Sequence, residues 1–215
     1  MPPRRTSLPR GSAAELFQPM LASAGGDAPA GDQWVFEPKY DGIRIIAIVL
    51  GDSVAMMTRN GHDKGRQFPE ITGCLRDLGK KLGRPLVLDG EVVALDSGGR
   101  PARFQDLQGR MHLLDEVAVT DRSTSAPAAF VAFDILVDGA DLLIQEEWGD
   151  RRSRLERVMK KLSSSMRRVL LLSDVSFGSP ESLMARAVLV LSAGSATRPS
   201  AAVQTTPCQP DGPVA

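Results

Sequence analysis

The chain has 215 residues, with 26 Lys and Arg against 26 Asp and Glu, and 42% of its residues are hydrophobic. This ordinary globular balance excludes a fibrous or wholly disordered protein, and the length suits one domain of moderate size with tails. Because the formal net charge is zero, any nucleic-acid partner has to be met by a local basic patch.

The apolar runs are too short for an integral membrane protein. The longest, residues 43–50, is interrupted by Arg44 and falls well below the roughly 18 residues that a membrane-spanning helix needs. No apolar stretch follows the N-terminal arginines, so we expect no secretory signal and no membrane partner. Two cysteines and two histidines without ligand spacing indicate a reduced, cytoplasmic protein without structural zinc.

Composition divides the chain into three parts. Residues 1–30 are rich in Pro, Gly, Ala and Ser and are predicted to be a flexible N-terminal segment. Residues 31–187 carry most of the charge and are predicted to form the ordered domain. Residues 188–215 hold only two charged residues and four prolines, so we predict a disordered tail.

Periodicity predicts a series of strands interrupted by helices. Alternating or continuous apolar runs predict strands, and apolar residues at helical spacing predict helices. In chain order we expect strands at 34–36, 43–50 and 53–58, a helix from Pro69 to about Leu82, a strand at 86–95 with a hairpin turn at 97–99, a helix at 104–113, a strand at 130–137, a helix at 150–162 and a strand at 169–172. Such an order favours an α+β fold with antiparallel sheets and flanking helices.

Common nucleotide-binding loops are absent from the sequence. The segment from Gly73 to Lys80 has five intervening residues where a phosphate-binding P-loop has four, and Lys81 stands where Ser or Thr is required. No G-x-G-x-x-G follows a predicted strand. Any nucleotide is therefore expected to bind by another route.

The segment EPKYDGIR, residues 37–44, places Lys39 between two acidic residues at the end of a predicted strand. A lysine amine attacks only in its unprotonated form, which nearby cations such as Arg44 or a bound metal favour, as does partial desolvation. The alternative is a solvated lysine paired with Glu37 or Asp41.

Three further segments are polar at strand edges: TRNG at 58–61, LDGE at 88–91 and FDIL at 133–136. Together with KYDG at 39–42, their order and spacing resemble the ATP-grasp-like nucleotidyltransferase domain of ATP-dependent DNA ligases, closest to those of bacterial non-homologous end joining. The resemblance extends from about Leu16 to Met184.

The resemblance implies that Lys39 is the catalytic nucleophile, which attacks the α-phosphate of ATP and holds AMP as a phosphoramide. It implies a nucleotide site made of Glu37 beside the adenine, Arg44 and Arg59 near ribose and phosphate, Glu91 on a ribose hydroxyl and Phe133 stacked on the base. Asp41 is assigned to orienting the lysine.

Each of these residues also has a structural explanation. Arg59 could belong to a hairpin turn, Glu91 could pair at a sheet edge and Phe133 could be ordinary core. Their shared order favours the functional interpretation.

Cofactors and partners also follow from the resemblance. ATP and Mg²⁺ or Mn²⁺ are the implied cofactors, without an assignment of metal ligands. The implied partners are nicked or broken duplex DNA and end-joining proteins such as Ku, in a bacterial cytoplasm and on the nucleoid when DNA is bound.

Residues 151–162 predict an amphipathic helix with six cationic side chains. Either this charge is a solvated outer face, or it contacts DNA phosphates with salt-dependent, sequence-independent affinity.

The sequence also departs from the family. An E-G-x-x-x-K motif and a later K-x-K strand are missing, and no lysine occurs after Lys161. We therefore expect no C-terminal oligonucleotide-binding barrel in this chain. We interpret the change after Ala187 as a frame shift or truncation. Two hypotheses remain: a DNA ligase with impaired sealing, and an inactive remnant that binds nucleotide or DNA weakly. An RNA ligase or capping enzyme matches the intervening segments less well.

Overall fold

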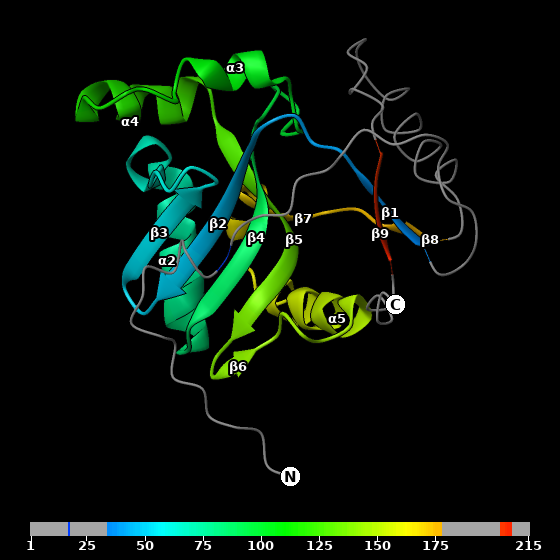
Figure 1. Cartoon of the computed structure of the whole chain (residues 1–215). Coiled ribbons are helices and arrows are strands. Elements are labelled where there is room, and N and C mark those ends of the chain that lie inside the picture. Colours follow the sequence, from blue (N-terminus) through cyan, green and yellow to red (C-terminus); the bar gives the residue numbers. More distant parts are fainter. Residues whose placement is uncertain (1–16, 18–33, 178–202, 208–215) are drawn as a thin grey trace.

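The structure is a computed structural model that describes Phe17, residues 34–177 and the backbone of residues 203–207 (Figure 1). Its strands are β1 (Trp34–Pro38), β2 (Ile43–Leu50), β3 (Ser53–Thr58), β4 (Leu86–Ala94), β5 (Ala128–Asp138), β6 (Asp141–Leu142), β7 (Leu170–Leu172), β8 (Ser176–Phe177) and β9 (Val203–Pro207). Its helices are α2 (Pro69–Leu82), α3 (Phe104–Gln108), α4 (Glu116–Ser125) and α5 (Trp148–Met159), with short 3-10 helices η1 (Gly65–Gln67) and η2 (Met166–Arg168).

Two sheets organise the described residues. The larger has the order β3-β2-β4-β5-β6, with β7 also paired to β5, and the smaller has the order β8-β1-β9. All of these pairs are antiparallel except β5 with β7, which is parallel. Because α5 lies between β5 and β7 in the chain, it serves as the crossover that a parallel pair needs. The predicted α+β fold is confirmed, with this one parallel pair as an exception to antiparallel sheets.

Helices α2 and α5 cover one face of the larger sheet. The largest hydrophobic cluster joins Leu75 and Leu78 of α2 and Leu155 of α5 to strand residues such as Leu88 and Val92. Helix α2 begins with a proline, which is favourable in the first turn, and ends at Gly83, whose φ of 64° is left-handed. The apolar residues that predicted this helix therefore pack in the core.

Strand alternation gives the larger sheet a second, partly polar face. In β4, Leu88 and Val92 point to the helices, so Asp89 and Glu91 lie on the opposite face. Part of that face is apolar and packs around Ile46, with Phe17 buried against it. Phe17 is thus ordered within a segment that we predicted to be flexible.

Three predictions of local structure need correction. The segment predicted as a tail without structure, 188–215, contains β9, which pairs with β1 over five residues; its β-branched residues at 203, 205 and 206 suit a strand, and β1 offers a free edge. Helix α4 was missed because Val119 is its one buried residue, although Asp115 caps it by accepting from Ala118 N at 2.9 Å. The turn at 97–99 forms, but only an isolated bridge follows it.

The remaining residues of both predicted end segments lie outside the described part of the chain. Among the described helices, none combines the length and the apolar character needed to cross a membrane.

Candidate active site

An ion pair between neighbouring strands forms the centre of the polar sheet face. Arg44 of β2 donates from Nε to Asp89 Oδ1 at 2.5 Å and from Nη2 to Asp89 Oδ2 at 2.8 Å. Burial opposes the charge on Arg44, but these two bonds and the neighbouring carboxylates raise its pKa above the ordinary value. Arg44 is therefore a fixed cation, held by a bidentate contact.

Glu91 lies directly across the strand pair from Arg44. Burial raises the pKa of Glu91 to about 7, while the positive charges of Arg44 and Lys39 and a hydrogen bond from the Gly42 backbone lower it. A Cβ atom on Gly42 would lie 2.1 Å from the carbonyl oxygen of Val92, so this close approach of the turn to β4 requires glycine. The KYDG turn is thereby fixed against the strand that carries Glu91.

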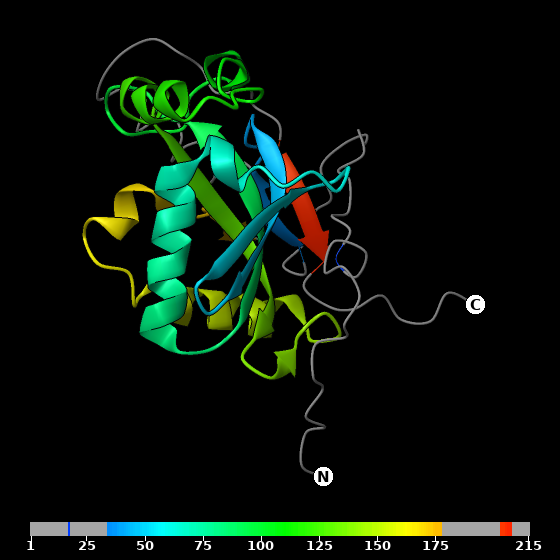
Figure 2. The same cartoon turned by 90° about the vertical axis from the view of Figure 1, so that its left-hand side faces the viewer.

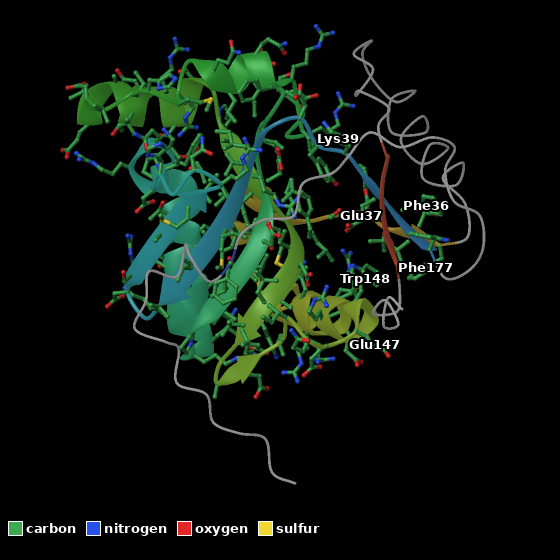
Figure 3. The ribbon with its side chains drawn as sticks, in the orientation of Figure 1. Phe36, Glu37, Lys39, Glu147, Trp148 and Phe177 are labelled. Atoms are coloured by element: carbon green, nitrogen blue, oxygen red, sulfur yellow. The ribbon has the colours of Figure 1, made fainter. Side chains whose placement is uncertain are left out.

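Lys39 follows β1 and its side chain is exposed, at the end of the strand nearest β2 (Figure 3). Its charge acts on Glu91, so the structure brings Lys39, Arg44 and Glu91 into one group. These are three of the residues that the sequence predicted for the site. The surrounding face leaves the amine open to a ligand from solvent.

Phe133 adds an aromatic ring to this group. Its side chain is 7% exposed, with the guanidinium carbon of Arg44 4.8 Å from the ring centroid and the Tyr40 ring stacked at 5.8 Å and 18°. Burial raises the pKa of Tyr40 to about 12, so that the phenol is neutral. Phe133 is therefore a buried residue that also makes a cation–π contact with Arg44, and stacking on a base stays a prediction.

Glu37 is buried behind this group and faces α5. Its Oε1 lies 3.7 Å from Arg152 Nη1, and neither atom has a hydrogen-bond partner among the described residues. Burial raises the pKa of Glu37 to about 7 although Arg152 lowers it. Arg152 also donates from Nη2 to the Ser173 carbonyl at 2.7 Å, and so joins α5 to the segment before β8.

A second arginine of α5 supports β5. Arg151 donates to both carboxylate oxygens of Asp134, the residue after Phe133, from Nε to Oδ1 at 3.0 Å and from Nη2 to Oδ2 at 2.8 Å. The sequence marked residues 88–91 and 133–136 as polar but did not identify roles for Asp89, Asp134, Arg151 or Arg152. The signal that could have identified them is the presence of charged residues in otherwise apolar strands, because a buried charge needs a partner of opposite charge.

Two of the residues predicted for the site, Asp41 and Arg59, make their contacts outside the group of Lys39, Arg44 and Glu91. Asp41 accepts a hydrogen bond from Phe104 N at 3.1 Å, so its carboxylate contacts the start of α3, and orientation of Lys39 by Asp41 stays a prediction. Arg59 is exposed in a turn closed by Gly61 N donating to Thr58 O at 2.9 Å. No ion pair links Arg59 to Glu91 within the described residues.

The described side chains do not identify a metal site. In the described ranges, no three His, Cys, Asp or Glu side chains are grouped as metal ligands. Ligands for Mg²⁺ or Mn²⁺ therefore stay unassigned.

Stability should depend on pH through Glu91. The Glu91 carboxyl group binds its proton more tightly in the folded state than in the unfolded state. Protonation of Glu91 therefore stabilises the fold below pH 4.5, and this stabilisation is lost as pH rises through about 7. Glu91→Gln should remove this dependence and gain about 1–3 kcal/mol relative to the parent chain between pH 5 and 8. Urea unfolding at several pH values measures it.

The matched control is Glu116→Gln, because the Glu116 side chain is 91% exposed. Parallel pH profiles for the parent chain and Glu91→Gln would contradict the burial of Glu91.

Comparisons with known proteins identify the family of this chain. A family model described as "ATP dependent DNA ligase domain" matches residues 19–182. The chain is 39% identical over 143 residues to DNA ligase C1 of Mycolicibacterium smegmatis, covering 65% of this chain and 40% of that protein. It is 34% identical over 150 residues to the bifunctional non-homologous end joining protein LigD of Bacillus subtilis, covering 68% of this chain and 24% of that protein.

Solved structures show the same relationship. The ligase domain of M. tuberculosis LigD superposes with a TM-score of 0.59 and 29% identity, over 76% of this chain and 48% of that one. A mycobacterial DNA ligase D complexed with ATP and MES superposes with a TM-score of 0.56 and 28% identity, over 76% of this chain and 48% of that one. The chain thus spans about half of these solved chains and 24–40% of the two curated relatives. With the family match covering most of its length, the chain belongs to the ATP-dependent DNA ligase family.

Proposed function

We propose that this chain carries the lysine adenylation step of a DNA ligase, with Lys39 as the nucleophile. The observation that carries the proposal is the placement of Lys39 beside Glu91 and Arg44, within a family match over residues 19–182. In this step the amine releases a proton, a nitrogen–phosphorus bond forms at the α-phosphate of ATP, and the bond to pyrophosphate breaks. ATP supplies the activated phosphoryl group.

The residues present fit a bound adenine nucleotide. Glu37 offers a buried carboxylate oxygen that accepts no hydrogen bond from the described residues, which suits a donor on the base. Glu91 can accept from a ribose hydroxyl, and Arg44 and Arg59 can compensate phosphate charge. Phe133 would meet the base at the ring that now contacts Arg44.

The later steps are proposed from the family. AMP would pass to the 5′-phosphate of a nick, and the 3′-hydroxyl would then displace AMP and seal the strand. Nicked or broken duplex DNA is the proposed substrate, with divalent Mg²⁺ or Mn²⁺. Relatives named as non-homologous end joining proteins support a role in repair and recombination. Partners such as Ku and a bacterial cytoplasm are further parts of the proposal.

A second candidate is a remnant that binds nucleotide or DNA without completing the reaction. The sequence lacks the E-G-x-x-x-K motif and has no lysine after Lys161. Loss of one group that compensates charge in the transition state typically costs about 2.7–4 kcal/mol, and several losses add to this cost. Impaired sealing is therefore part of the proposal.

Incubation with ATP and Mg²⁺ followed by intact-mass measurement tests the first step. We expect an AMP adduct on the parent chain and on Lys80→Ala, an exposed lysine on α2, and no adduct on Lys39→Ala. The reason is that only Lys39 lies beside Glu91 among these two lysines. An unmodified parent chain favours the remnant, and an adduct on Lys39→Ala rules out Lys39 as the nucleophile.

Nick sealing tests the later steps. With a labelled nicked duplex, ATP and Mg²⁺, we expect sealing by this chain to fall below detection because the missing lysines leave phosphate charge uncompensated. A full-length family ligase is the positive control. Robust sealing by the chain alone would show that the missing motifs are dispensable.

A further inference from the structure

The basic helix predicted at 151–162 divides into two parts in the structure. Three of its arginines are used inside the protein: Arg151 binds Asp134, Arg152 contacts Glu37 and Glu156, and Arg154 binds Asp141 with Nη1 to Oδ2 at 2.8 Å. These arginines hold the helix on the sheet. The remaining cations of this helix and its extension lie at its C-terminal end and are exposed.

This end is continuous with two other basic segments. Lys81 of α2 donates from Nζ to the carbonyl oxygen of Lys161 at 2.7 Å, and Arg167 of η2 donates from Nη2 to that of Lys160 at 3.2 Å. Figure 2 shows the η2 segment beside α2, with α5 near the lower end of α2. We call this surface the basic corner, and its exposed members are Lys80, Lys81, Arg157, Lys160, Lys161, Arg167 and Arg168.

Helix-end electrostatics account for only part of the basic corner. Cations near a helix C-terminus interact favourably with its exposed carbonyl groups, as Lys81 and Arg167 do. Lys80 pairs with Asp52 at 2.9 Å. Within the described residues, no ion pair compensates the other four cations of the corner. The sequence has no acidic residue between Arg157 and Ser173.

Acidic neighbours on these elements are few. Asp77 lies one turn before Lys81 on α2, and Glu156 is engaged by Arg152 with Nε to Oε1 at 3.0 Å. Since the whole chain has a net charge of zero, the excess at this corner is local. Repulsion among such cations lowers stability unless an anionic partner compensates it.

We propose that the basic corner binds the phosphate backbone of duplex DNA, at a surface separate from the Lys39 site. The corner lies in the helix layer, whereas Arg44 and Glu91 lie on the opposite face of the sheet. Contact through lysines and arginines at helix ends fixes no base sequence, so affinity depends on salt and not on sequence. The choice of DNA as partner rests on the proposed function.

The experiment measures binding of the full chain to an intact 20-base-pair duplex, without ATP, over a range of salt concentrations. The corner variant is Lys160→Ala with Arg168→Ala. The matched control is Arg66→Ala with Arg122→Ala, which removes the same charge from exposed residues of η1 and α4. Helix α2 separates Arg66 from the corner by about 21 Å, at 1.5 Å for each of its 14 residues.

We expect the corner variant to bind at least about fivefold more weakly near 0.1 M salt, and the slope of log affinity against log salt to decrease by about 2, because each lost phosphate contact removes about 0.9. The control should keep the parent slope. Equal slopes for the two variants, or no binding by the parent chain at low salt, would overturn the proposal.

Measuring AMP-adduct formation by the corner variant distinguishes failure of the DNA-binding proposal from failure of the adenylation proposal. Adduct formation should equal that of the parent chain, because the corner lies away from Lys39. Failure of the parent chain to form an adduct would count against the adenylation proposal and leave the DNA result valid.

Discussion

The structure depends on charge compensation for carboxylates that are buried or half-buried on or beside one face of a sheet. Placing a carboxylate there is costly unless a cation or a hydrogen-bond donor accompanies it. The carboxylates are Glu37, Asp89, Glu91 and Asp134, and the arginines that accompany them are Arg44, Arg151 and Arg152. This group explains why α5 is fixed to the sheet by charged as well as apolar contacts, and why the turn after β1 approaches β4 so closely.

The proposed function relies on the same arrangement. The arginines are largely engaged by carboxylates, whereas Lys39 is exposed beside Glu91, whose pKa burial raises to about 7. A nucleotide entering the site would therefore meet a lysine open to solvent, next to charges that the strands hold in place. Such fixed charges cost little reorganisation during a reaction, which is how electrostatic catalysis works. The proposed adenylation and the proposed DNA contact at the basic corner use opposite faces of the sheet.

Much of the fold was predictable because apolar periodicity reports burial. The helix from Pro69 to Leu82 and the strands at 43–50 and 53–58 were predicted with these boundaries. Helix α4 buries little and left no such signal, and pairing of β9 with β1 depends on a free strand edge that no local pattern reveals. The motifs singled out Lys39, Arg44 and Glu91, which the structure brings close together. Arg152 was hidden in a charge run, because sequence alone does not distinguish a buried arginine from a solvated one.

A double-mutant cycle on Arg44 and Asp89 tests the central claim most directly. Unfolding in urea would be measured for the parent chain, Arg44→Met, Asp89→Asn and the double variant at pH 7. If the bidentate pair holds the sheet face together, each single variant is destabilised and the coupling energy is about 1.5–3 kcal/mol. Additive effects, with coupling within about 0.5 kcal/mol of zero, would contradict the account.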